Sequence, residues 1–194
     1  MMILNTPNAD LFISCLKNYG FLSQEAQLDL NAKIQTITKR KGSYIIKEGQ
    51  TVSSFFVIRK GMIRSFFRRG NQEITAWFGY EGQQFAAITS FFDNKPSHET
   101  IECLENCEFQ FISGKDMAEL YQKHNDLNTI GRKIVEDYCK VLDDRIFALQ
   151  TMSAEQRYKD LMQHHPEVIK RVSLGYIASF LGISQETLSR VRRK

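Results

Sequence analysis

The sequence predicts an α+β fold: an N-terminal antiparallel β-roll of the jelly-roll type with flanking helices, a long helix, and an all-α helix-turn-helix domain at the C-terminal end. Three observations support this prediction. Short runs rich in Phe and Ile alternate with glycines between residues 34 and 82. Residues 115–150 follow, with apolar side chains at helical spacing and no proline. Two short amphipathic helices are then predicted at the end of the sequence. We expect three parts, at 1–114, 115–150 and 151–194.

The composition is that of a globular protein without a strong overall charge. The 194 residues are 42% hydrophobic and 25% charged, and the formal net charge is +4. No apolar run approaches the ~20 residues of a membrane-spanning helix, and an acid precedes the first apolar stretch, so we expect neither a membrane partner nor a signal peptide. The four cysteines form no CxxC pair, which favours a reducing, cytoplasmic location.

The roll is expected to follow two helices. Residues 8–31 carry apolar side chains at helical spacing, and Ser23 is placed to cap a second helix within them. Strands are then predicted at 34–38, 44–47, 55–59, 62–67, 73–78, 100–104 and 108–113. A turn at Gly70-Asn71 joins two of them, and a short helix with a loop at 93–97 precedes the last pair. Short strands separated by turns are typical of an antiparallel roll.

The segment 115–150 is expected to form a dimer contact. Its apolar stripe comprises Ile130, Ile134, Tyr138, Val141, Arg145 and Leu149, and Leu142 and Ile146 broaden it. A stripe of this length needs a partner, and we favour parallel pairing with the same helix of a second chain. Packing against the roll of the same chain is the alternative.

The last 44 residues are predicted to be helical. Ser153 and Gln156 are placed to form a capping box for a helix that stops before Pro166. From residue 172 the pattern is that of a helix-turn-helix, with caps at Ser173 and Ser184 and a positive φ at Gly182. Its small core would comprise Ile177, Ala178, Leu181, Ile183, Leu188 and Val191.

The exposed face of the final helix indicates DNA binding. The candidate contact residues are Gln185, Glu186, Ser189, Arg190 and Arg193, together with the two capping serines, Ser173 and Ser184. Such side chains hydrogen-bond to base edges and phosphates in a major groove, and arginine makes a bidentate contact to guanine. Residues 170–194 hold six basic side chains and one acidic one, and phosphate neutralisation supplies most nonspecific affinity. A helical hairpin with a solvated basic tail is the alternative.

Three segments, GSYIIKEGQTVSSFFVIRKGMIRSFF, SAEQRYKDLM and IASFLGISQETLSRVRRK, resemble the Crp/Fnr family of bacterial transcription regulators, and the last two resemble its Bacteroidetes branch. The resemblance covers nearly the whole sequence. It implies a cyclic-nucleotide-type roll at 1–114, a dimerisation helix at 115–150 and a DNA-binding domain at 151–194. It also implies a homodimer with double-stranded DNA as partner and RNA polymerase as a further candidate. Glu186 and Arg190 match base-reading positions of the family, whereas Gln185 replaces an arginine.

Two departures from the family pattern bear on function. Nucleotide-binding members hold the ribose with a glutamate and the cyclic phosphate with an arginine. Here Ala87 and Ser97 stand at those places, and Glu99 adds a negative charge, so cyclic AMP binding is not expected. The sequence also ends shortly after the recognition helix, so we expect no β wing on the DNA-binding domain.

An effector pocket is expected between the roll and the long helix. Its candidate lining is Phe85, Ala86, Ala87, Ile88, Thr89, Ser97, His98, Glu99 and Leu142. This lining favours a small hydrophobic or weakly polar effector, or none, and no other cofactor is expected.

The sequence gives little support for catalysis or for metal binding. The sequence has no nucleophile elbow, phosphate loop or HExxH motif, so we expect no enzyme activity, no catalytic residue and no metal ligand. Cys103 and Cys107 are spaced so that their thiols can meet, although burial as small apolar residues is favoured. The second functional hypothesis is a small-molecule sensor that acts through protein contacts rather than DNA.

Overall fold

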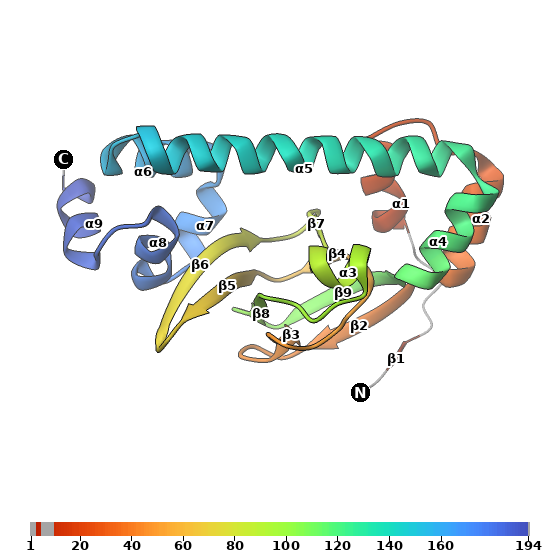
Figure 1. Cartoon of the computed structure of the whole chain (residues 1–194), viewed down its shortest axis with the longest axis horizontal. Helices are drawn as coiled ribbons and strands as arrows, with labels where there is room; N and C mark the ends of the chain where they lie inside the picture. Colours follow the sequence, from red (N-terminus) through yellow and green to blue (C-terminus); the bar gives the residue numbers. More distant parts are fainter. Residues whose placement is uncertain (1–2, 5–9, 194) are drawn as a thin grey trace.

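A computed structural model describes residues 3–4 and 10–193, and it has the predicted α+β organisation (Figure 1). The described strands are β1 (Ile3–Leu4), β2 (Gln35–Lys39), β3 (Tyr44–Ile46), β4 (Ser54–Lys60), β5 (Ile63–Arg69), β6 (Gln72–Gly79), β7 (Gln84–Phe85), β8 (Thr100–Cys103) and β9 (Cys107–Ser113). The described helices are α1 (Asp10–Lys17), α2 (Gln24–Lys33), α3 (Ile88–Asp93), α4 (Gly114–Lys123), α5 (Asn125–Thr151), α6 (Ala154–His164), α7 (Pro166–Arg171), α8 (Leu174–Leu181) and α9 (Gln185–Arg192).

The roll consists of two antiparallel sheets, with strand orders β1-β2-β9-β4-β7 and β3-β8-β5-β6. Their inward side chains include three aromatic rings in contact: Phe56 stacks on Phe85 at 4.9 Å, and Phe85 meets Phe109 edge-on at 5.9 Å. Phe85 is turned inward because the two-residue strand β7 pairs with β4, opposite Phe56. Phe85 and Ala87 were predicted to line the effector pocket, but both belong to this buried core.

The N-terminal helices form a second core with the start of α5. Residues 8 and 9 of the predicted first helix lie outside the described residues, and α1 begins at Asp10. Ser23 caps α2 as predicted, because its hydroxyl accepts a hydrogen bond from the Ala26 N–H. Ile130 is buried in this core, and Ile134 packs against it. These two residues of the predicted dimer stripe therefore contact their own chain.

The segment predicted as one helix at 115–150 is divided at His124. Helix α4 ends at Lys123, and His124 adopts an extended backbone (φ −125°) before α5 begins. The His124 Nε2 lies 2.8 Å from an Asp29 carboxylate oxygen on α2, which anchors the break. Beyond it, α5 runs for 27 residues along one side of the molecule (Figure 1). None of the helices in the described ranges combines the length and hydropathy needed to cross a membrane.

The C-terminal domain has the predicted caps and turn, with two differences. The Ser153–Gln156 capping box is present, and Gly182 has a φ of 67°. The helix stops before Pro166 as predicted, but Pro166 begins an additional helix, α7, since proline is tolerated at a first helical position. Ser173 occupies the N-cap position of α8, but its side chain makes no capping hydrogen bond.

The C-terminal domain is docked on the β6 edge of the roll (Figure 1). The Ser179 hydroxyl on α8 accepts the Thr75 N–H at 2.9 Å and donates to the Glu73 carbonyl at 3.1 Å. The Arg64 guanidinium lies 3.7 Å from the centre of the Tyr176 ring. These contacts fix where the helix-turn-helix stands relative to the roll.

Candidate nucleic-acid interface and effector pocket

Helix α9 presents a polar face that no described part of the chain covers. Leu188 is fully buried against the domain core, and this orients the helix. Gln185, Glu186, Arg190 and Arg193 are exposed, whereas Ser189 is half-buried. The structure therefore places the candidate base-reading side chains together on one accessible face.

The start of α9 is well capped. Ser184 accepts a hydrogen bond from the Thr187 N–H at 3.2 Å, and Arg190 donates to the Thr187 hydroxyl at 3.2 Å. A hydrogen bond from Ser184 lowers the pKa of Glu186, and the charge of Arg190 contributes. Glu186, in the first turn of α9, is therefore ionised at neutral pH. Ser173 is exposed at the start of α8, while Lys194 lies outside the described residues.

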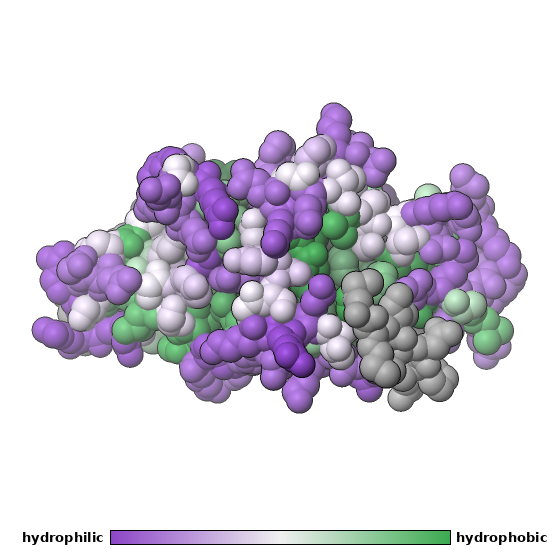
Figure 2. All heavy atoms as spheres, turned by 90° about the horizontal axis from the view of Figure 1, so that it is seen from below, coloured by the Kyte–Doolittle hydropathy of each residue, from purple (hydrophilic) through white to green (hydrophobic). Residues whose placement is uncertain are grey.

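The C-terminal half of α5 carries an exposed apolar seam. Val135, Cys139, Leu142, Ile146 and Leu149 are all exposed and recur at alternating intervals of four and three residues. This is the spacing of the core positions of a parallel coiled coil. Hydrophilic residues dominate the opposite face of the molecule, which is seen in Figure 2. Seven of the fourteen large hydrophobic side chains that are exposed in the described part of the chain belong to α5.

The seam differs from the stripe that the sequence predicts. Tyr138, Val141 and Leu149 are exposed as the prediction requires. Arg145 is turned inward instead: it donates to the Phe180 carbonyl, and its guanidinium lies 4.0 Å from the centre of that ring. Burial lowers the pKa of Arg145 to about 10, and the charge of Arg157 contributes. The spacing of Val135, Cys139 and Leu142, at intervals of four and three, was the available signal for this exposed seam.

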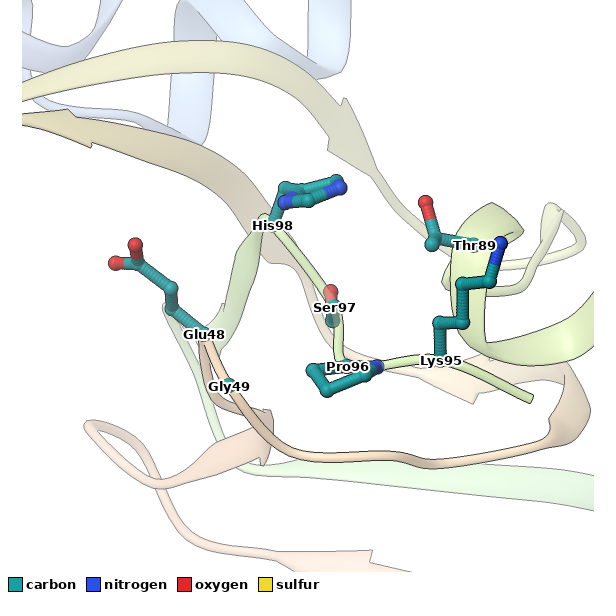
Figure 3. A pocket seen from close by; sticks show the side chains of 7 residues that line it. All are labelled: Glu48, Gly49, Thr89, Lys95, Pro96, Ser97 and His98. Atoms are coloured by element: carbon teal, nitrogen blue, oxygen red, sulfur yellow. The ribbon is translucent and has the colours of Figure 1, made fainter. Parts of the chain in front are cut away.

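A cavity of about 340 Å³ lies where the short helix α3 meets the following loop (Figure 3). Thr89, Ser97 and His98 line it as predicted, and Glu48, Gly49, Lys95 and Pro96 complete the lining. Figure 3 shows the side chains of His98 and Lys95 extending toward Thr89, while the Glu48 carboxylate points away. The loop before β4 was not predicted to contribute, because only the folded roll brings it beside residues 95–98.

Ser97, which the resemblance to the Crp/Fnr family aligns with a phosphate-binding arginine, has a structural role. Its hydroxyl donates to the Glu99 carbonyl at 3.0 Å and accepts the Glu99 N–H at 3.1 Å. The side chain is buried and its hydrogen-bonding capacity is used by the backbone. It therefore offers no substitute for an arginine.

Glu99, the residue after His98, is half-buried and forms hydrogen bonds with two strands of the roll. Its Oε2 accepts hydrogen bonds from the Ser65 hydroxyl and from the Trp77 Nε1, the latter at 3.2 Å. Burial raises the pKa of this carboxyl, and the two donors only partly oppose the shift. The remaining pocket candidates are more open: Ala86 is half-buried, whereas Ile88 and Leu142 are exposed.

Three of the four cysteines are buried inside the roll and the N-terminal core. Cys103 and Cys107 are buried free thiols, and a hydrogen bond between them, together with burial, raises the pKa of Cys103. Within the described ranges, no group of three or more His, Cys, Asp or Glu side chains is arranged to hold a metal ion.

Comparison with known proteins gives a family for the roll. Residues 36–124 match the cyclic nucleotide-binding domain model. A comparison with curated protein sequences finds no match.

Solved structures extend the likeness to nearly the whole chain. The catabolite activator protein of Thermus thermophilus is 20% identical, with a TM-score of 0.58 over 92% of this chain and 85% of that one. FixK2 from Bradyrhizobium japonicum is 16% identical, with a TM-score of 0.66 over 82% and 83%. The global regulator CLP of Xanthomonas campestris is 15% identical, with a TM-score of 0.67 over 88% and 90%. Residues 36–124 thus match the cyclic nucleotide-binding domain, and the chain shares its fold with the catabolite activator protein, FixK2 and CLP.

Proposed function

We propose that the chain is a sequence-specific DNA-binding transcription regulator that acts as a homodimer and does not bind cyclic AMP. The observation that carries the proposal is the uncovered polar face of α9, with Gln185, Glu186 and Arg190 exposed on a helix whose core side is anchored by Leu188. Similarity to the fold of regulators such as FixK2 and CLP supports the same role.

The apolar seam of α5 is the proposed dimer contact. Parallel pairing of two copies would cover Leu142 and Ile146, which a single chain leaves exposed. It would also present two copies of α9 to half-sites about one DNA turn apart. RNA polymerase remains a candidate partner of the DNA-bound dimer.

The pocket is proposed to be unsuited to cyclic AMP for three reasons. Ala87 lies in the core and has no acceptor for a ribose hydroxyl, and the Ser97 hydroxyl is used by the backbone. The Glu99 carboxylate would repel a phosphate. Each lost charge-assisted hydrogen bond costs ~1.5–3 kcal/mol. Losing two weakens binding by roughly two to four orders of magnitude. Calorimetry with cyclic AMP tests this, and micromolar affinity would refute it.

Selection of sites from a random oligonucleotide pool tests DNA reading. We expect a two-fold symmetric site. Arg190→Ala should weaken binding to it by ~1–3 kcal/mol and relax preference at one base in each half-site. Lys140→Ala, which removes an equal charge from the exposed side of α5, is the matched control and should bind like the parent. If Arg190→Ala bound the selected site as tightly as the parent, Arg190 would not be a DNA contact.

Cys139 reports on the dimer, because it is exposed in the seam while the other three cysteines are buried. A parallel in-register pair places Cys139 opposite its own copy, so mild oxidation with diamide should give a disulfide-linked dimer. In a Cys139→Ser background, Lys140→Cys places a thiol one residue away from the seam and should crosslink poorly. Equal crosslinking at both positions, or a monomer at working concentration, would contradict the pairing.

The alternative function, a sensor that acts only through protein contacts, gives a different result on immobilised random DNA. A DNA-binding regulator is retained and then released as salt rises. Passage without retention would favour the alternative.

A further inference from the structure

Two arginines join the end of α5 to the helix that precedes α9. Arg145, on α5, donates a hydrogen bond to the Phe180 carbonyl, and its guanidinium lies 4.0 Å from the centre of the Phe180 ring. Arg157, on α6, donates from Nε to the Leu181 carbonyl at 3.0 Å and from Nη1 to the Met152 carbonyl at 2.5 Å. The last turn of α8 is therefore bound both to α5 itself and to the residue that ends α5.

The accepting carbonyls are of the kind that a helix leaves free at its end. The last four C=O groups of an α-helix have no partner within it, and the negative end of the helix dipole lies there. The N–H groups that follow α8 return to the carbonyls of Ala178 and Ser179. The carbonyls of Phe180 and Leu181 accept hydrogen bonds from the arginines instead. Arginine is charged at neutral pH, so these are charge-assisted bonds, which are stronger than neutral ones.

This pair of arginines, which we call the arginine clamp, connects the apolar seam to the recognition helix. Along the chain, α5 and α9 are separated by the helices α6, α7 and α8, although both α9 and the end of α5 lie at the same end of the molecule (Figure 1). Arg145 is the neighbour of the seam residue Ile146 and binds Phe180 directly. A Cβ atom added to Gly182 would lie 3.5 Å from Cδ2 of Leu149, another seam residue. The turn before α9 therefore lies against the helix that carries the proposed dimer contact.

We propose that the arginine clamp sets the separation of the two copies of α9 in the dimer, and thereby the spacing of the half-sites that the protein accepts. Arg145 and Arg157 are positioning residues in this proposal: they act through α8 and do not contact DNA. The seam fixes the two copies of α5 about the two-fold axis, so the distance of each α9 from that axis depends on how its domain is held to α5. The inference rests on the proposed function and adds what determines the geometry of the DNA site.

DNA sites with altered half-site spacing provide the first test. One base pair inserted at the centre of the selected site rotates one half-site by roughly 36° and shifts it by about 3.4 Å relative to the other. The parent should bind this altered site at least about tenfold more weakly than the selected one. Arg145→Met keeps an apolar side chain but removes the donors, so the difference should fall below about threefold, with the base preference in each half-site unchanged. Arg132→Met changes an exposed arginine of α5 and is the matched control, which should discriminate like the parent.

The distance between the two copies of α9 provides a second test, which needs no DNA. A spin label at Arg192→Cys in a Cys139→Ser background reports on this distance, because Arg192 is exposed on α9 and the other three cysteines are buried. Double electron–electron resonance should give a narrow distance distribution in this background and a broader one when Arg145→Met is added. Thermal melting checks that each variant is folded. If Arg145→Met does not unfold cooperatively, Arg157→Met removes the other half of the clamp and takes its place in both tests.

A merely structural role of the clamp gives different results from a positioning role. Unchanged discrimination between spacings in Arg145→Met, an equal loss of affinity for every spacing, or a distance distribution no broader than in the background would each overturn the inference. If the parent is a dimer that binds no DNA, the proposed function fails, and the distance measurement alone decides on the clamp. If the parent binds its DNA site and the variant discriminates equally well, only this inference fails. A monomeric parent would overturn both.

Discussion

Replacing Arg64 by methionine should destabilise the protein strongly, because it removes the positive centre of a buried charge cluster. The Arg64 side chain is 1% exposed, and its Nε lies 2.9 Å from an oxygen of Glu102, whose side chain is 14% exposed. Glu73 forms a second ion pair with the same guanidinium. Breaking a buried pair by removing one partner costs ~3–5 kcal/mol. For a chain of this size, that corresponds to a lowering of the melting temperature by roughly 6–20 °C.

The cost should come mainly from the carboxylate that loses its partner. Burial raises the pKa of Glu102, and Arg64 opposes this increase. Without Arg64 the pKa rises further, so protonation relieves the penalty and the variant should recover stability relative to the parent as the pH falls. Adding Glu102→Gln should likewise restore at least about 1 kcal/mol at neutral pH.

Urea unfolding at two pH values, with thermal melting as a second measurement, provides the assay. Arg68→Met is the matched control, because the Arg68 side chain is 52% exposed on the same strand. The free energy of unfolding of this variant should lie within about 0.5 kcal/mol of that of the parent. A stability of Arg64→Met within about 1 kcal/mol of the parent would refute the reasoning, as would a double variant no more stable than the single one.

The remaining predictions concern the helix-turn-helix and its attachment to the roll. Gly182→Ala should cost about 1 kcal/mol in thermal melting, because alanine rarely adopts a φ of 67°; an unchanged melting temperature would contradict this. Ser184→Ala should cost ~0.5–2 kcal/mol and fray the start of α9, which amide exchange at Thr187 would detect. Arg171 holds the pKa of Glu81 at about 2, so the stability difference between the parent and Glu81→Gln should be present above about pH 4.5 and vanish toward pH 2. A difference independent of pH would argue against this ion pair.

The features predicted correctly from the sequence are those that depend on local chemistry. The Ser153–Gln156 capping box, the Ser23 cap and the positive φ of Gly182 each involve residues within one helical turn. The alternation of short strands and glycines likewise indicated the roll. Such signals need no information on what lies across the core.

The errors concern which face of an element the rest of the chain covers. Ile130 fits a helical stripe well, but only the folded chain shows that α1 already occupies that side of α5. Phe85 lies beside candidate pocket residues in sequence, and its inward orientation depends on pairing with Phe56, 29 positions earlier. The environment of Glu99 is invisible for the same reason, since its two hydrogen-bond donors, Ser65 and Trp77, come from two other strands.

The docking of α8 on β6 explains why the roll and the C-terminal domain are held as one body. Strand β6 is at the edge of its sheet, and an edge exposes unpaired N–H and C=O groups. The Ser179 hydroxyl accepts a hydrogen bond from the Thr75 N–H and donates one to the Glu73 C=O. It thus replaces two hydrogen bonds that a neighbouring strand would form. Strand β5 beside it presents Arg64 to Tyr176 and, from the next position, Ser65 to Glu99. Adjacent residues of β5 therefore contact the helix-turn-helix and the candidate pocket residue Glu99.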